Sequence, residues 1–301
     1  MPSITTSDGV RLDYRESGDP AGRPVVLLAG FLAPATSWRY QVDALGAAGF
    51  RMLALDLRGH GTSEHRDSGN SMARRAADLR EFLVALALRD VVLVGGSMGG
   101  NTIWAYLDAE GPELVSQIVI IDQTPKMLNT TGHPGEAGWP CGFYGYTEAN
   151  RHTLFGSGVP ETGHGTPPQK RGRRIVRMLG ATGSGGSPVS VLTSALRSVL
   201  AKHELTTGEL ELLHNHAVAD WRDVIAASRL PVLFIAGRES EFWPAGHAAA
   251  SALLGGNPAA CSIVIENAGH ATNLEQPDEV NLAVLEFLGP RVREAAVGGR
   301  G

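Results

Sequence analysis

The sequence has 301 residues, of which 43% are hydrophobic and 19% charged, proportions that suit one large soluble domain with a sizeable core. A formal net charge of -5 does not favour nucleic acid or an anionic membrane surface as a partner. No apolar run approaches the ~20 residues that span a bilayer, and the N-terminus lacks the pattern of a signal peptide. With only Cys141 and Cys261 present, no disulfide framework is implied. These features predict a cytoplasmic protein.

Short apolar runs alternate with helical stretches along the chain, which predicts parallel βαβ units. The opening differs, because Asp8-Gly9 indicates a turn between two antiparallel strands. Further strands are predicted at 24–29, 51–56, 91–94, 117–122, 231–236 and 262–266. Helices are predicted at 36–47, 72–88, 99–110 and 281–288.

A long interval separates the strand that ends at Asp122 from the one that begins at Pro231. Its first part is rich in Gly and Pro, and its second part has helical character at 189–202 and 208–227. So long a connection inside one domain is usually functional. We therefore expect a core formed by 1–124 and 229–294, a cap inserted at 125–228, and a flexible tail at 295–301.

The strongest motif lies at Val91–Gly100, where Gly95-Gly96-Ser97-Met98-Gly99 fits Gly-x-Ser-x-Gly between an apolar strand and a helical segment. Such a turn lifts the serine hydroxyl clear of the sheet and places it at a helix N-terminus. A phosphate-binding turn of a dinucleotide fold is the alternative, but Ser97 interrupts the Gly-x-Gly-x-x-Gly pattern. The motif predicts that Ser97 is a nucleophile.

With these residues in view, nearly the whole chain resembles the α/β-hydrolase superfamily. Asp56–Ser63 looks like the family's Asp-x-Arg-Gly-x-Gly-x-Ser turn, and Pro24–Trp38 resembles its oxyanion loop. That loop usually reads His-Gly-Phe, whereas this chain has Ala29-Gly30-Phe31. The resemblance implies a mostly parallel eight-stranded sheet flanked by helices, with an inserted, mainly helical cap. It also implies an oxyanion hole made by the backbone N–H groups of Phe31 and Met98.

A serine hydroxyl needs a base to accept its proton. Of ten histidines, His270 follows the last predicted strand in the sequence Ala268-Gly269-His270. This step resembles the histidine loop of the family, and the order serine before histidine fits as well. We therefore expect His270 to be the base.

The acid that orients the histidine is left open by the sequence. The family usually has Asp in a Gly-x-x-Asp-x-x-x-Pro pattern, but here Ser240 stands at the acid position between Gly237 and Pro244. The candidates are Asp122, which ends the strand after the serine motif as in some branches of the superfamily, and Glu241 or Glu239 in the loop. Asp122 could equally be a structural carboxylate that caps a turn.

The reaction class follows from the nucleophile. Epoxide hydrolases and haloalkane dehalogenases of this fold use Asp, so Ser97 favours acyl chemistry, with an ester or lactone as substrate. Aromatic side chains of the cap predict a mostly apolar pocket. The pocket candidates are Gly30, Trp139, Phe143, Tyr144 and Trp243.

Other functions remain compatible with the same residues. They are carbon–carbon bond hydrolysis, a perhydrolase reaction, a biosynthetic lyase or cyclase reaction, and a non-catalytic ligand-binding role. No histidine and cysteine spacing indicates a zinc site, and no cofactor is implied. The expected partner is a small-molecule substrate. A homodimer is compatible with the sequence, which leaves the oligomeric state open.

Overall fold

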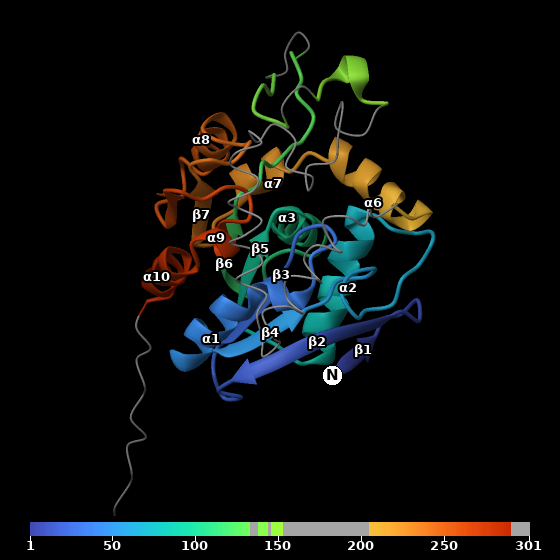
Figure 1. Ribbon diagram of the computed structural model, residues 1–301, viewed down its shortest axis with the longest axis vertical. Coiled ribbons are helices and arrows are strands. Elements are labelled where there is room, and N and C mark those ends of the chain that lie inside the picture. Colours follow the sequence, from blue (N-terminus) through green and yellow to red (C-terminus); the bar gives the residue numbers. More distant parts are fainter. Residues whose placement is uncertain (133–137, 144–145, 153–204, 290–301) are drawn as a thin grey trace, which may run out of the picture.

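The computed structural model describes residues 1–132, 138–143, 146–152 and 205–289 (Figure 1). Eight strands in this part of the chain form one sheet in the order β1-β2-β4-β3-β5-β6-β7-β8. β1 pairs with β2 and β2 with β4 in antiparallel fashion, and every other neighbouring pair is parallel. The strands are β1 Ser3–Thr5, β2 Arg11–Gly18, β3 Pro24–Leu28, β4 Arg51–Leu55, β5 Val91–Gly96, β6 Val115–Ile121, β7 Val232–Gly237 and β8 Ala260–Ile265.

Helices cover both faces of this sheet. α2 and α3 share one hydrophobic cluster with side chains from one face, and α1 and α10 share a second cluster with side chains from the other. The helices are α1 Arg39–Ala47, α2 Met72–Ala85, α3 Met98–Glu110, α6 Thr207–Val218, α7 Arg222–Ala227, α8 Ala245–Ala252, α9 Thr272–Glu275 and α10 Pro277–Leu288, with 3-10 turns at Ala35–Trp38 (η1) and Glu148–Asn150 (η2). This three-layer arrangement confirms the fold class that the sequence predicts.

The sequence pattern explains why these elements form. Every residue of β3 after Pro24 is buried, as a central strand between two helical layers requires. At the start of α2, the Ser71 side chain accepts the amide of Arg74 at 3.1 Å, which satisfies one of the free N–H groups of the first turn. Gly9 has a φ of +81° in the turn between β1 and β2, where the Asp-Gly pair predicts a hairpin.

The helical character predicted at 208–227 is confirmed, and it is divided between two helices. α6 ends at Val218 and α7 begins at Arg222, because Asp220 forms an isolated β-bridge and an ion pair of 2.9 Å with Lys126, and the Trp221 amide donates to Pro125. α2 also ends at Ala85, three residues before its predicted end. The predicted helix at 189–202 lies outside the described residues.

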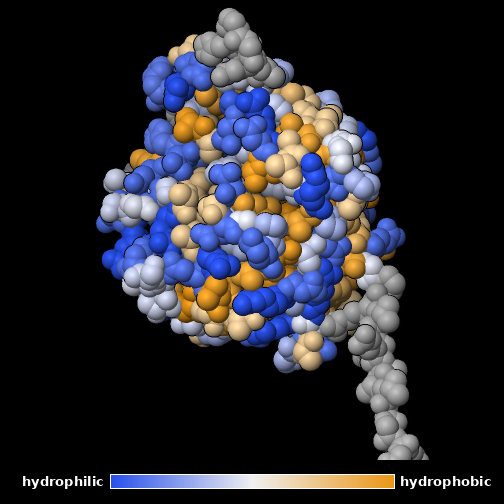
Figure 2. Space-filling view, turned by 180° about the vertical axis from the view of Figure 1, so that it is seen from behind, coloured by the Kyte–Doolittle hydropathy of each residue, from blue (hydrophilic) through white to orange (hydrophobic). Residues whose placement is uncertain are grey.

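The surface of the described part is mixed in character. Seen from behind, hydrophobic residues show between hydrophilic ones across the face (Figure 2). Exposed large hydrophobic residues are spread over the N-terminus, α2, α6, β8 and α10, which is ordinary for a globular domain. Among the described residues, no helix combines the length and the apolar character that crossing a membrane requires.

Candidate active site

Ser97 lies on the sharp turn between β5 and α3, with φ 52° and ψ -129°. A Cβ atom at Gly95 would lie 2.5 Å from the Gly100 nitrogen, and one at Gly99 would lie 2.1 Å from the Leu28 carbonyl oxygen. Only glycine fits at either position, because real Cβ atoms do not approach backbone so closely. The Gly-x-Ser-x-Gly spacing therefore has a steric cause. The close backbone packing on both sides of Ser97 holds its strained conformation in place.

The structure brings Ser97, His270 and Asp122 into one hydrogen-bonded chain. His270 Nε2 lies 2.9 Å from Ser97 Oγ, and His270 Nδ1 lies 2.7 Å from Asp122 Oδ2. Asp122 follows β6 and His270 follows β8, so each reaches the carboxyl edge of the parallel sheet, where β5 also ends. The Asp122 side chain is 1% exposed and that of His270 is 20% exposed. A substrate can thus meet the imidazole while the carboxylate stays out of water.

Two further groups hold the Asp122 carboxylate. Ser240 Oγ donates to Oδ2 at 2.5 Å, and the Gly237 amide donates to Oδ1 at 2.9 Å. Ser240 in turn accepts the Phe242 amide at 3.2 Å. The sequence identifies Ser240 only as a missing acid, and does not reveal that it is a hydrogen-bond donor to the acid. The signal in the sequence is a serine at the position where the family pattern has Asp, because a hydroxyl there can donate to a carboxylate that comes from the neighbouring strand.

The alternative acids differ from Asp122 in their surroundings. Both carboxylate oxygens of Glu241 are buried and have no hydrogen-bond partner in the part of the chain that the structure describes, so Glu241 does not orient His270. The backbone amide of Glu239 donates to the Ala268 carbonyl. Of the three candidates, Asp122 is the one whose hydrogen bond to the histidine ring is shown.

The predicted oxyanion loop lies against the serine. A Cβ at Gly30 would meet Ser97 Cβ at 3.0 Å, so the loop backbone approaches the nucleophile closely. Asp56 anchors the loop by accepting the Ala35 amide at 2.6 Å. Phe31 and Met98 are both buried, and the Phe31 and His60 rings form a T-shaped pair with a centroid distance of 5.8 Å. The Asp56–Ser63 turn thus supports the loop even though Ala29 replaces the usual histidine.

The candidate pocket residues divide into groups. Phe143 packs on Phe242 at 6.1 Å between ring centroids, and Phe242 packs on His270 at 5.5 Å. Trp139 is tied to the segment after β6, since its indole N–H donates to the Lys126 carbonyl. Tyr144 lies outside the described residues.

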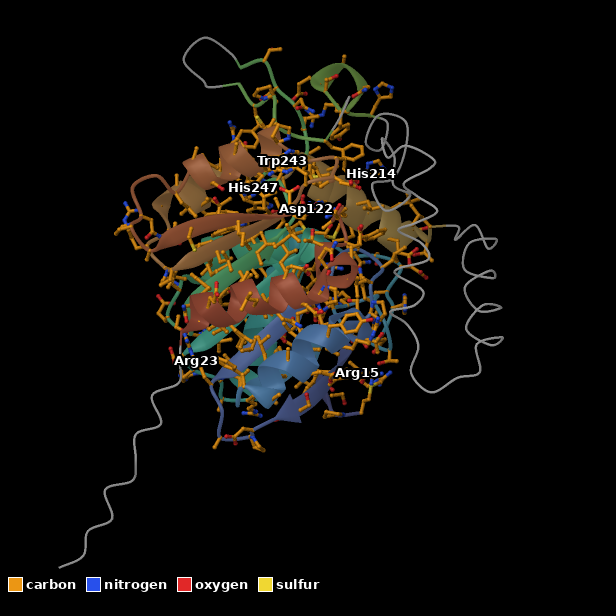
Figure 3. All side chains as sticks on the ribbon, turned by 60° about the vertical axis from the view of Figure 1, so that its left-hand side comes forward. Arg15, Arg23, Asp122, His214, Trp243 and His247 are labelled. Atoms are coloured by element: carbon orange, nitrogen blue, oxygen red, sulfur yellow. The ribbon has the colours of Figure 1, made fainter. Side chains whose placement is uncertain are left out.

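Trp243 faces a different set of groups. Its ring lies 5.7 Å from the His247 ring (Figure 3). The Arg238 guanidinium lies over the same indole, 4.1 Å from the ring centroid. His247 lines a small cavity together with Asp122 and Phe242. Burial lowers the pKa of His247, with the nearby Asp122 acting in the opposite direction. This histidine is therefore neutral at pH 7, and it lies on the same small cavity as Asp122. Among the described residues, no group of three potential ligands could hold a metal ion.

Comparison with known proteins agrees with the fold and the serine motif described above. A model of the α/β hydrolase fold family matches residues 23–277. The chain therefore belongs to the α/β-hydrolase fold family, as its motifs suggest.

Individual relatives differ in how much of the chain they match. A non-heme haloperoxidase of Rhodococcus erythropolis is 27% identical over 299 residues, which cover 96% of this chain and 99% of that protein. The non-heme chloroperoxidase CPO-A1 of Kitasatospora aureofaciens is 37% identical over 141 residues, 45% of this chain and 50% of its own length. A solved bromoperoxidase of Bacillus anthracis superposes with a TM-score of 0.70 at 23% identity, covering 95% of this chain and 99% of that one. This last likeness supports the fold.

Proposed function

We propose that this α/β hydrolase cleaves a carboxylic ester or lactone of a mostly apolar small molecule through an acyl-enzyme on Ser97. The observation that carries the proposal is the hydrogen-bonded chain from Ser97 through His270 to Asp122, which has the geometry of a nucleophile, a base and an orienting acid. Nucleophile and base lie within hydrogen-bond reach, at 2.9 Å between Ser97 Oγ and His270 Nε2.

In the proposed reaction, Ser97 Oγ attacks the carbonyl carbon while His270 Nε2 accepts the hydroxyl proton. Asp122 accepts the Nδ1–H, keeps the ring in the correct tautomer and stabilises the imidazolium. The carbonyl oxygen becomes an oxyanion, which the N–H groups of Phe31 and Met98 stabilise. The tetrahedral intermediate collapses, and the leaving oxygen takes the proton from His270. Water, deprotonated by His270, then attacks the acyl-enzyme and releases the acid and the free serine.

The apolar character of the substrate rests on Phe143 and Phe242. Phe242 makes an edge contact with the His270 ring and Phe143 makes one with Phe242, so the side of the imidazole that they cover is apolar. Small-molecule sites of this kind combine an apolar lining with a few fixed polar groups. We expect the acyl or alcohol part of the substrate to contact these two rings.

The test is hydrolysis of a panel of aryl esters of increasing chain length and of several lactones, with labelling by a fluorophosphonate. We expect turnover and labelling in the wild-type protein and neither in Ser97→Ala. Ser262→Ala, a change on the exposed part of β8, is the matched control and should retain both. Unchanged hydrolysis in Ser97→Ala would refute the proposal. Absence of both turnover and labelling in the wild type would favour a non-catalytic ligand-binding role.

A second candidate is perhydrolysis, because one relative that matches nearly the full chain is a non-heme haloperoxidase. In that reaction hydrogen peroxide replaces water in the second step, so that the acyl-enzyme yields a peracid and the free serine. Adding hydrogen peroxide to the ester assay and measuring peracid separates the two reactions. Product analysis also separates carbon–carbon bond hydrolysis and lyase or cyclase chemistry from ester hydrolysis.

A further inference from the structure

Arg75 on α2 is a buried arginine with most of its hydrogen-bonding capacity unused. It is 2% exposed and is one of the largest fully buried side chains. Its Nη2 lies 2.9 Å from Nε2 of His60, but Nε and Nη1 have no partner in the described part of the chain. Buried polar groups are almost always hydrogen-bonded, and buried charges are almost always paired. Arg75 departs from both rules at once.

The carboxylate nearest to Arg75 along α2 is already occupied. Asp78 is fully buried and accepts two hydrogen bonds of 2.8 Å from Arg58 and one of 2.9 Å from Arg74. Its charge acts on Arg75 only through space, and burial lowers the pKa of Arg75 to about 10. The guanidinium remains protonated at neutral pH and lacks a hydrogen-bonded counter-charge.

A second unused polar atom comes from the helix that packs on α2. α6 is fixed to the start of α2 by hydrogen bonds from the Met72 amide to Asn215 at 2.7 Å and from the Asn70 amide to Glu211 at 2.9 Å. His216 of α6 is 3% exposed, and its Nδ1 has no partner among the described residues. Burial and the charge of Arg75 lower the pKa of His216 to about 3, so the ring is neutral and can present an N–H.

We propose that Arg75 and His216 form a binding site for a small anion, of halide or formate size, between α2 and α6. The free groups of Arg75 are N–H donors on a cation, so the complementary ligand is an acceptor with negative charge. A water molecule would satisfy the donors but not the charge. Because both side chains are closed off from solvent, the site suits an ion of one or a few atoms and excludes a substrate-sized molecule.

The function of such a site is to hold the cap-side helix on the core. An anion that binds the folded chain and not the unfolded one stabilises it in proportion to its occupancy. The site lies next to His60, whose ring contacts Phe31 of the oxyanion loop, so it supports that loop from behind. This inference does not depend on the proposed reaction, because its test measures stability and not activity.

The experiment is thermal unfolding of the full chain at constant ionic strength, with sodium gluconate replaced stepwise by chloride, bromide or formate. We expect the wild-type midpoint to rise by about 2 °C or more and to saturate. Arg75→Met should show no such rise, and in gluconate it should be at least as stable as the wild type, since methionine avoids burying a charge. Arg80→Met is the matched control, because Arg80 lies on the same helix with its side chain 38% exposed.

The halide and formate arms show which source of negative charge the site accepts, and a response to either that requires Arg75 supports the proposal. A wild-type midpoint that responds to none of the anions would overturn it, as would an equal response in Arg75→Met. If that variant does not fold, anomalous scattering from bromide-soaked wild-type crystals gives the answer. A bromide peak beside Arg75 Nε or Nη1 supports the site, and no peak between α2 and α6 refutes it.

Discussion

Moving the acid of the proposed triad from β6 to β7 tests the assignment of Asp122 directly. In Asp122→Asn the side chain loses the charge that stabilises the imidazolium. The amide can also donate to the ring, which favours the wrong histidine tautomer. The equivalent change in a serine protease triad lowers kcat about 10⁴-fold, which corresponds to about 5.4 kcal/mol of barrier. We expect a loss of this size in ester hydrolysis, because the carboxylate is buried and lies 2.7 Å from His270 Nδ1.

The structure also indicates how to restore the activity. Ser240 Oγ lies 2.5 Å from the Asp122 oxygen that His270 contacts, so a carboxylate at position 240 reaches the same neighbourhood. The double variant Asp122→Asn/Ser240→Asp should therefore recover about 10²-fold of the loss, which is about half of the barrier change. Ser240→Asp alone removes the hydroxyl that donates to Asp122 and places a second carboxylate beside it, so the two carboxylates repel each other.

The assay is kcat and kcat/KM on the best ester of the panel for the four combinations at positions 122 and 240. Glu241→Gln is the control, since that carboxylate makes no hydrogen bond to the histidine. The reasoning is refuted when Asp122→Asn retains activity within about 10-fold of wild type, or when Glu241→Gln loses as much.

Three further predictions concern the groups around the site. Ser240→Ala removes one donor to the buried carboxylate and should lower kcat about 10-fold while KM stays nearly constant, as steady-state kinetics would show. Asp78→Asn removes the fully buried counter-charge of Arg58, which keeps only its ion pair of 2.9 Å with Asp8, and should lower the free energy of unfolding by about 3 kcal/mol in denaturant titrations. The pKa of His216 falls from 6.5 to about 3 on folding, because of burial and then Arg75. Neutral His216 therefore does not reduce the free energy of unfolding above pH 6.5. Below that pH the unfolded chain takes up the proton first, so the free energy of unfolding falls by about 1.4 kcal/mol per pH unit. His216→Phe should make that slope shallower by one proton, and an unchanged slope would contradict the burial argument.

The parts of the site that the sequence predicts are those encoded over short stretches. Ser97 is recognisable because the glycines two positions away are forced by close backbone contacts, and His270 because it follows the last strand. The alternation of apolar runs and helical periods likewise predicts the layers, since each run must be buried on both faces. These features are recognised from neighbouring residues in the sequence and not from contacts with distant parts of the chain.

The parts that the sequence leaves open depend on contacts between distant residues. Whether Asp122 or a glutamate orients His270 is decided by a hydrogen bond across 148 positions of the chain. The break between α6 and α7 depends on Lys126, which lies 94 positions from Asp220. Nothing near Arg75 in the sequence shows that α6 will cover it.

The position of the acid follows from the topology of the sheet. β6 and β7 are parallel neighbours, and the last paired residues of β6 lie beside β7 near the point where each strand ends. A carboxylate after β6 and a residue in the loop after β7 therefore meet at the same edge, as the hydrogen bond between Asp122 and Ser240 shows. The acid can therefore stand after β6 or after β7 while His270 stays in place, provided that the residue at the other of these two positions donates a hydrogen bond to the carboxylate. Ser240 meets this condition, and this is why an Ala at 240 should impair the reaction while an Asp there should replace Asp122.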